Sequence, residues 1–352
     1  MKRALFALLF LTLLLSACAP KAKTPLSVFC AGSLIQPFAN LERAFEAENP
    51  DIDVQNECHG SIQVIRHVTD LHKPIDVVAT ADYALIPMLM YATNDPQTGK
   101  PYANWAIQFA SNRLGIAYTA NSRYADEITP ETWSEILARP DVRVGIADPR
   151  FDAAGYRALM VFQLAEAPAN QPTLFEDMFA GQFRYPITTR TEETATLIHV
   201  PEILETTPNA HVVVRGSSIQ LIALLESGDL DYAFEYESVI RQHNLQLLPL
   251  PDSLNLGVEQ QAEAYQRVTV VLDFQRFKVV KPIFQGGTIA YGITIPSNAP
   301  HPQEAARFIE FLLGEKGREL MEADYHPIFQ PALSDGQQNL PAALQPLTKP
   351  MP

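Results

Sequence analysis

The feature that most constrains the fold of this chain is a regular alternation of short apolar runs with segments of helical periodicity. The apolar runs have the length of single strands and comprise residues 25–30, 51–58, 75–80, 113–119, 142–147, 210–216, 231–236 and 287–295. Between them, apolar residues recur at three- and four-residue steps, as in Leu34, Phe38, Leu41 and Phe45. This alternation predicts an α/β fold with parallel sheets covered by helices on both faces. Because 352 residues exceed what one hydrophobic core usually organises, we expect two domains.

The N-terminus has the form of a secretion signal. Lys2 and Arg3 precede an apolar run over residues 4–15 that is too short to cross a bilayer comfortably. The residues Leu15-Ser16-Ala17-Cys18 resemble the lipobox of bacterial lipoproteins, in which cleavage leaves Cys18 as the acylated N-terminus. The alternative is an ordinary signal peptide in which Cys18 is incidental. We therefore expect a lipoprotein signal peptide over residues 1–17 and a short tether over residues 18–24.

The charge balance argues against polyanionic partners. The chain has 26 basic and 40 acidic residues, a net charge of −14 that becomes −16 when Lys2 and Arg3 leave with the signal. A field of this sign disfavours nucleic acid and an anionic membrane face as partners. A small bound anion would have to be held by local dipoles.

Two strand ends carry the same turn. Residues 30–33 read Cys-Ala-Gly-Ser and residues 58–61 read Cys-His-Gly-Ser, and in each a glycine and a serine stand where a helix begins. Serine favours the N-cap, and a helix N-terminus offers N–H groups and partial positive charge to an anion. Capping alone would explain one such turn. Two of them, at the carboxyl ends of successive strands, predict an anion site at that edge of the sheet.

The shared offset also bears on Cys30 and Cys58. If the two strands are parallel neighbours, the Cα atoms of these cysteines lie roughly 5 Å apart, within reach of a disulfide. The expected compartment permits the bond. Two buried free thiols are the alternative.

The sequence also contains acidic residues whose negative charge would repel an anion at the predicted site. In "DPRFDAAGYR" (148–157), Asp148 and Asp152 precede a helix start and could simply cap it. Glu235 lies in the apolar strand "YAFEY", and a buried acid needs a partner. Arg157, Arg215 or a backbone N–H is one kind of partner, and the central atom of a bound ion is another.

The remaining motifs give less information about function. "RGSS" (215–218) is either a third anion-binding turn or a cap for the helix that follows. The histidines His59, His67, His72 and His243 show no metal-ligand spacing and are interpreted as surface or capping residues. The sequence has no G-x-S-x-G, H-E-x-x-H, P-loop or post-strand G-x-G-x-x-G motif, so we expect no enzyme and no cofactor.

Taken in order, the two Gly-Ser turns, Asp152 to Arg157, "LLESGDLDYAFEYESV" (224–239) and residues 286–321 resemble an extracytoplasmic substrate-binding protein of an ABC importer. "DAAGYR" with "DYAFEYESV" narrows the resemblance to the tungstate/molybdate-binding lipoproteins. The resemblance implies a type II periplasmic-binding-protein fold, two α/β lobes joined by crossing hinge strands. It also implies that Ser33 and Ser61 hold the anion from one lobe, while Asp152 and Glu235 bind its tungsten or molybdenum atom from the other.

The sequence departs from that family at one place. Relatives often carry Asp-Pro-Cys-Gly-Tyr-Arg where this chain has Asp-Ala-Ala-Gly-Tyr-Arg, so the loop conformation is open and Asp148 competes with Asp152 as ligand. Its distance to Gly-Tyr-Arg favours Asp152. Tyr156 and Tyr236 are more often packing residues, although a hydroxyl of either could reach the ligand.

The chemistry of the ions explains why acids would serve. A carboxylate beside sulfate or phosphate meets like-charge repulsion, whereas hexavalent tungsten and molybdenum are hard centres that accept further oxygen ligands. Two acids would thus attract tungstate and help to reject sulfate. No residue separates tungstate from molybdate, and another oxyanion, a ferric ion held by tyrosines and acids, or a lipid-anchored esterase remain alternatives.

We therefore expect one lobe over residues 25–108 plus 281–340 and a second over residues 109–280, with crossings near 109–112 and 279–286. Residues 341–352, rich in proline, are expected to form a loosely attached tail. The protein is expected to be a monomer, lipid-anchored in the periplasm or at the cell surface, that delivers its anion to an ABC permease.

Overall fold

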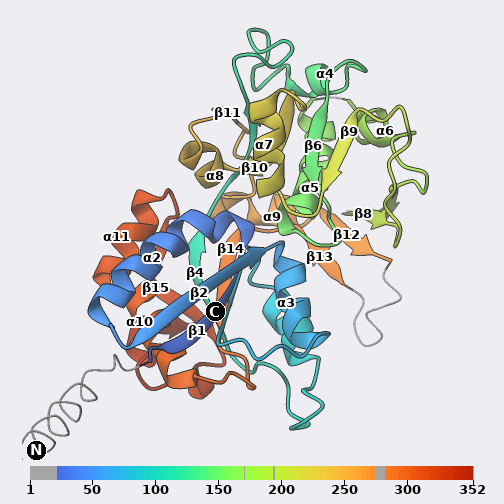
Figure 1. Ribbon diagram of the computed structural model, residues 1–352. Coiled ribbons are helices and arrows are strands. Elements are labelled where there is room, and N and C mark those ends of the chain that lie inside the picture. The colour runs from blue at the N-terminus through green and yellow to red at the C-terminus, as the bar shows by residue number, and fades with distance from the viewer. Residues whose placement is uncertain (1–21, 170, 193–194, 274–281, 352) are drawn as a thin grey trace, which may run out of the picture.

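The computed structural model describes residues 22–169, 171–192, 195–273 and 282–351 (Figure 1). The expected signal peptide and Cys18 lie outside these residues, as does part of the expected second crossing. Within the described residues, no helix has the length and apolar character needed to cross a membrane.

A seven-stranded sheet organises the first lobe. It contains, in spatial order, β16 (Thr348–Pro350), β15 (Ile328–Asp335), β4 (Ala106–Ser111), β14 (Ala290–Thr294), β3 (Val77–Thr80), β1 (Thr24–Ala31) and β2 (Ile52–His59). Figure 1 shows α2 (Ile35–Glu48), α10 (Pro302–Leu313) and α11 (Glu315–Ala323) grouped on one side of this sheet and α3 (Ser61–Thr69) on the other. Short helical turns η2 (Gly32–Leu34), η3 (Ile86–Tyr91), η5 (Gln337–Asn339) and η6 (Gln345–Leu347) complete this lobe.

The predicted apolar faces form the core of this lobe. Phe38 and Phe45 of α2 meet Phe308 of α10 edge to face, with ring centroids 6.0 and 5.4 Å apart. Such aromatic pairs stabilise a contact beyond the area that they bury. Leu71 lies beyond the end of α3 and is exposed.

A five-stranded sheet organises the second lobe. Its order is β11 (Gln246–Pro249), β5 (Leu114–Tyr118), β10 (Tyr232–Tyr236), β6 (Val144–Ala147) and β9 (Val212–Arg215). The helices of this lobe are α4 (Trp133–Leu137), α5 (Ala153–Ala169), α6 (Leu174–Phe179), α7 (Ile219–Ser227) and α8 (Glu237–Gln242). Phe162 of α5 packs between Trp133 and Phe234, so this long helix lies in the interior of the lobe.

A third sheet was not expected from the sequence. It comprises β13 (Ile283–Gln285), β12 (Val268–Leu272), β8 (Ala195–Val200) and β7 (Thr188–Glu192), and the chain enters β12 through η4 (Glu259–Gln261) and α9 (Ala262–Tyr265). We describe it with the second lobe, because its strands fall between the same two crossings of the chain. The first crossing follows β4 at Asn112 and Arg113, and the second lies between β13 and β14.

The α/β fold class is confirmed, but the expectation of parallel sheets is wrong in part. β1 pairs in parallel with β2 and β3, whereas β14 runs antiparallel to β3 and β4. β4 leaves the first lobe and β14 returns to it, so the two strands run in opposite directions.

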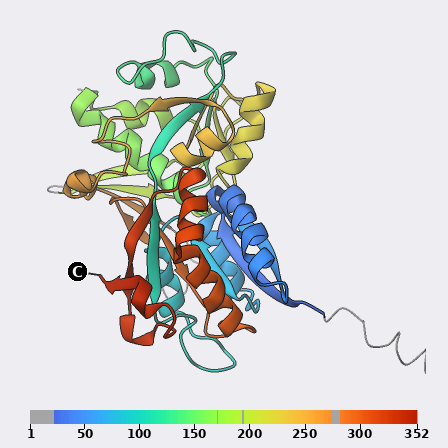
Figure 2. The same cartoon turned by 90° about the vertical axis from the view of Figure 1, so that its left-hand side faces the viewer.

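The expectation of a loose C-terminal tail is also wrong. β16 pairs in parallel with β15, and Leu344 is fully buried. Figure 2 shows the red strand β15 beside the teal strand β4, and β16 pairs with β15 on the side away from β4. Prolines are tolerated here because β16 is an edge strand, where one side of the backbone needs no partner.

The parallel register of β1 and β2 places Cys30 opposite Cys58. The two are joined by a disulfide with Cα atoms 4.4 Å apart. It ties together the two strands whose ends carry the Gly-Ser turns.

Candidate functional site

The two Gly-Ser turns lie at the carboxyl ends of β1 and β2, and both serines are buried. Neither side chain caps its own helix. The Ser33 hydroxyl shares a hydrogen bond of 2.8 Å with the Tyr291 hydroxyl. The Ser61 hydroxyl accepts the backbone N–H of Ala81 at 3.0 Å, so its own proton remains available to donate. Simple helix capping therefore does not account for these serines.

The glycines of these turns touch the second lobe. A Cβ on Gly32 would stand 2.7 Å from the Ser217 hydroxyl oxygen, and one on Gly60 would stand 2.4 Å from the carbonyl oxygen of Phe151. The first turn of α3 bridges the lobes as well, because the N–H of Ile62 donates to that same carbonyl at 3.0 Å. The lobes are closed on each other here, and the absence of side chains at the two glycines permits that approach.

Asp152 faces these turns from the start of α5. One carboxylate oxygen accepts the N–H of Ala154 at 2.9 Å, which is the capping role considered above. The other accepts the Ser217 hydroxyl at 2.9 Å and the N–H of Ser218 at 3.1 Å. Asp152 therefore caps α5 with one oxygen and joins a polar cluster with the other.

Glu235 occupies the middle of β10, where every residue is buried. Its Oε1 accepts the Ser218 hydroxyl at 3.1 Å and the N–H of Tyr236 at 2.7 Å. Its Oε2 is shielded from solvent and has no hydrogen-bond partner among the described residues. A buried carboxylate oxygen without a partner is costly and marks a position where a ligand atom would be stabilising.

The two acids affect each other. Burial and, to a smaller extent, the charge of Asp152 raise the pKa of Glu235 to about 8, although the hydrogen bonds from Tyr236 and Ser218 lower it. Burial also raises the pKa of Asp152, although three hydrogen bonds oppose the effect. Two neighbouring carboxyls with raised pKa values favour either a proton or an electron-poor centre between them.

Asp148 is committed elsewhere. Its carboxylate forms an ion pair with Arg150, at 2.5 Å between Oδ2 and Nη2, and also accepts the backbone N–H of that residue. The charge of Asp148 is thus compensated within its own loop. This arrangement favours Asp152 over Asp148 as the acid that faces a ligand.

Tyr156 and Tyr236 belong to a contact between the lobes. Arg157 donates to the Tyr236 hydroxyl at 2.6 Å and to the carbonyl of Ala81 at 2.8 Å, and it lies 3.3 Å from the Asp82 carboxylate. The Tyr156 hydroxyl donates to Asp82 as well. Both predicted tyrosines therefore use their hydroxyls in a latch, formed by Asp82, Tyr156, Arg157 and Tyr236, that joins the first lobe to the second.

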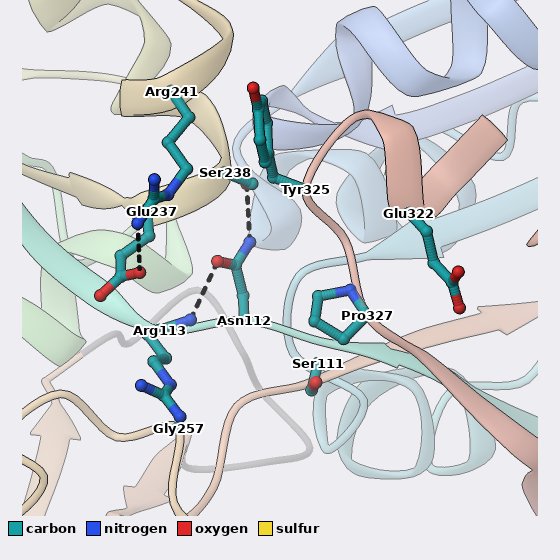
Figure 3. Close-up of a pocket in the computed structure, with 10 residues that line it drawn as sticks. All are labelled: Ser111, Asn112, Arg113, Glu237, Ser238, Arg241, Gly257, Glu322, Tyr325 and Pro327. Atoms are coloured by element: carbon teal, nitrogen blue, oxygen red, sulfur yellow. Dashed lines mark hydrogen bonds and ion pairs between the residues drawn. The ribbon is translucent and has the colours of Figure 1, made fainter. Parts of the chain in front are cut away.

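Sequence reasoning missed the polar residues at the hinge. Asn112 donates to the Ser238 hydroxyl at 2.8 Å and to the Tyr291 hydroxyl at 3.0 Å, so the contact of Ser33 continues through the hinge. Figure 3 shows Asn112 pointing toward Ser238 beside a cavity of about 580 Å³. The position of Asn112 at the expected crossing was the available signal. Ser217 and Ser218 were considered only as a possible anion turn or cap, whereas here they donate to the two acids.

Two α/β lobes that close over buried serines and acids, with crossing strands between them, define a two-lobed solute-binding protein of the periplasmic type. The family model described as bacterial extracellular solute-binding protein matches residues 26–325, and the chain belongs to this family. Its members are binding proteins of transport systems, which agrees with a periplasmic or cell-surface location.

Individual relatives show a more specific similarity than the family model does. The molybdate/tungstate-binding protein of Thermococcus kodakarensis is 37% identical over 93% of this chain and 88% of its own length. That of Pyrococcus abyssi is 38% identical over 92% of this chain and 90% of its own length. Among solved structures, the periplasmic molybdate-binding protein of Azotobacter vinelandii shares the fold, with a TM-score of 0.53 at 13% identity over 87% of this chain and 100% of that one. The resemblance to the molybdate/tungstate-binding proteins is thereby confirmed, whereas the lipid anchor and the ligand residues stay predictions.

Proposed function

We propose that this protein captures tungstate or molybdate outside the cytoplasmic membrane and delivers it to the permease of an ABC importer. Relatives named for binding these two anions align along almost the whole chain. The observation that carries the proposal is the buried Oε2 of Glu235, near Asp152, which has no hydrogen-bond partner in the described ranges of the chain.

The acids supply the selectivity. Hexavalent tungsten and molybdenum accept hard oxygen donors, so each carboxylate can bind the metal atom of the anion while its four oxygens stay in place. Sulfur and phosphorus in sulfate and phosphate do not accept such donors, and those anions would meet only the negative charge of the acids. Asp152 and Glu235 thus favour one class of tetrahedral anion and oppose the other.

The first lobe supplies the opposite wall. In the proposed complex, Ser33 and Ser61 donate hydroxyl protons to the anion's oxygens. Ser61 is suited to this role because its hydroxyl already accepts from Ala81. Closure of the lobes through the latch then shields the anion from water.

Competition calorimetry tests the proposal. Tungstate and molybdate should bind tightly, and a large excess of sulfate or phosphate should leave their affinity unchanged. Loss of tungstate binding in the presence of sulfate would refute selection by the central atom. Tight ferric binding, or hydrolysis of an ester substrate by the purified protein, would favour the alternatives named above.

A structure of the complex tests the ligand set directly. Anomalous scattering from tungsten should place the metal within bonding distance of oxygens from Asp152 and Glu235. A metal atom surrounded only by its own four oxygens, with both acids turned away, would leave a solute receptor of unknown cargo.

Outside the cleft, we propose that the mature protein is a monomer anchored by a lipid on Cys18. The match of Leu15-Ser16-Ala17-Cys18 to a lipobox supports this part. Mass spectrometry of the membrane-extracted protein should find the acylated cysteine as the N-terminal residue, and a Cys18→Ala variant should be released from the membrane.

A further inference from the structure

Away from the cleft, the structure gathers two histidines and a glutamate at the end of β2. Glu57 and His59 are two residues apart on this strand and therefore lie on the same face of it. His67 lies in the second turn of α3. One possible ligand atom from each residue lies within 4.8 Å of the other two. We propose that Glu57, His59 and His67 form a binding site for a divalent transition-metal ion, a site separate from the oxyanion cleft. Their sequence spacing concealed it, because the three residues converge only when α3 folds back over the strand.

The cluster is held in place by its surroundings. The Nε2 of His59 lies 2.8 Å from an oxygen of Glu57, and the rings of His59 and His67 meet at 5.0 Å between centroids. Phe29 of β1 lies opposite Glu57 in the parallel register and contacts both imidazole rings. The neighbouring disulfide fixes the same pair of strands. The ligands are therefore positioned by rigid elements, which lowers the ordering needed to bind an ion.

His67 has a nitrogen that its environment leaves unused. Its Nδ1 is shielded from solvent and has no hydrogen-bond partner within the described part of the chain. A ring nitrogen that makes no other hydrogen bond can serve as a metal ligand.

The residue types define the class of ion. Two imidazoles and one carboxylate suit Zn²⁺, Cu²⁺ or Ni²⁺, whereas Mg²⁺ and Ca²⁺ prefer oxygen donors alone. Three protein ligands leave a coordination position open to water. Because His59 directly precedes Gly60 and His67 shares a helix with Ser61, a bound ion would connect the two elements that flank this turn.

Lys73 is the natural competitor of the ion. Its ammonium lies 3.9 Å from an oxygen of Glu57 and over the ring of Phe29. The hydrogen bond from His59 and the charge of Lys73 outweigh the burial of Glu57 and lower the pKa of its carboxyl. A divalent ion would take over the role of the ammonium, so removal of Lys73 should strengthen metal binding.

Calorimetry with Zn²⁺ alone, on the untagged and chelator-treated chain without oxyanion, tests the site. We expect one ion per chain, an affinity reduced by roughly tenfold or more in His67→Gln or His59→Gln, and an affinity raised several-fold in Lys73→Gln. His243→Gln, an exposed histidine after α8, is the matched control and should bind as the parent does. Thermal unfolding of each metal-free variant verifies its fold.

The possible results either support or overturn the metal site. X-ray absorption of the zinc complex should show two imidazole ligands. No binding, binding that survives both histidine substitutions, or an affinity unchanged by Lys73→Gln would overturn the site. Tungstate binding by the same variants reports on the cleft, so failure of the metal site and failure of the proposed function are distinguishable.

Discussion

Glu235 destabilises the ligand-free protein by an amount that follows from its pKa. Burial raises that pKa to about 8 from an ordinary 4.5, so at pH 7 the folded chain holds a proton that the unfolded chain has released. Because one pKa unit corresponds to about 1.4 kcal/mol, this group lowers the free energy of unfolding by about 3 kcal/mol at pH 7. The sign follows from proton binding, since stability falls with rising pH wherever the folded state binds more protons. The penalty is therefore absent below pH 4.5 and reaches its full value above pH 8.

A Glu235→Gln variant removes the charge and keeps the shape of the side chain. We expect the ligand-free variant to be more stable than the parent by up to about 3 kcal/mol at pH 7, and by about 1 kcal/mol or less at pH 5. The first figure is an upper bound, because the amide still leaves one buried polar atom without a partner. Urea unfolding at the two pH values measures the difference.

The same variant should lose its response to the ligand. A ligand present at a thousand times its Kd stabilises the folded state by about 4 kcal/mol, and most of this effect should disappear when one donor to the metal is removed. Glu226→Gln, at an exposed position on α7, is the control and should match the parent in both tests. A variant no more stable than the parent at pH 7, yet stabilised equally by tungstate, would refute the reasoning.

Further predictions test the site and its supports. Because metal ligation needs the carboxylate of Glu235, calorimetry should find tungstate affinity rising with pH until about pH 8 and constant above it; an affinity that falls over this range would mean that a protonated Glu235 donates to the anion. Gly60→Ala should weaken binding by at least roughly tenfold, about 1.4 kcal/mol, because its Cβ would meet the carbonyl of Phe151, whereas Gly287→Ala, which meets nothing, should bind normally. Asp82→Asn should cost the closed form about 1–3 kcal/mol by weakening the contacts of Arg157 and Tyr156, visible in small-angle scattering as a more open complex; an unchanged profile and affinity would exclude the latch. Intact mass before and after reduction and alkylation should reveal the disulfide, and free thiols in the native protein would exclude it. Because the disulfide joins residues 28 positions apart, its removal should lower the free energy of unfolding, measured in urea, by about 3–4 kcal/mol.

Periodicity and short motifs in the sequence predicted those helices, strands and turns that depend only on neighbouring residues. The face of α2 and the strand "YAFEY" are encoded by periodicity, and each Gly-Ser turn by two adjacent residues. The third sheet escaped prediction because its strand β7 is polar and partly exposed, and β8 pairs with β12 about seventy residues later. β16 escaped because the prolines of residues 341–352 indicate a tail unless an edge position is known in advance.

The residues of the candidate site were also predicted only in part. Asp152 and Glu235 were predicted as ligands from the family resemblance, since capping alone would have explained Asp152, whereas the apolar strand around Glu235 already pointed to a buried acid in need of a partner. Their partners Ser217 and Ser218 come from another strand–helix junction, and no periodicity states which junctions meet. The convergence of His59 with His67 is invisible for the same reason, since it depends on how α3 lies over β2 rather than on residue spacing.

The Gly-Ser-Ser turn before α7 explains how two acids can coexist in this cleft. Neighbouring buried carboxyls repel each other when both are charged, and without donors the pKa of each would rise further. Ser218 gives its N–H to Asp152 and its hydroxyl to Glu235, so one residue at a helix start serves both. This support is incomplete, because Oε2 of Glu235 has no hydrogen-bond partner among the described residues. A turn that satisfied every carboxylate oxygen would leave no reason to bind an electron-poor metal centre, and one that satisfied fewer would raise both pKa values further. The partial support observed here limits the rise of both pKa values, and it leaves the remaining stabilisation to the anion's central atom.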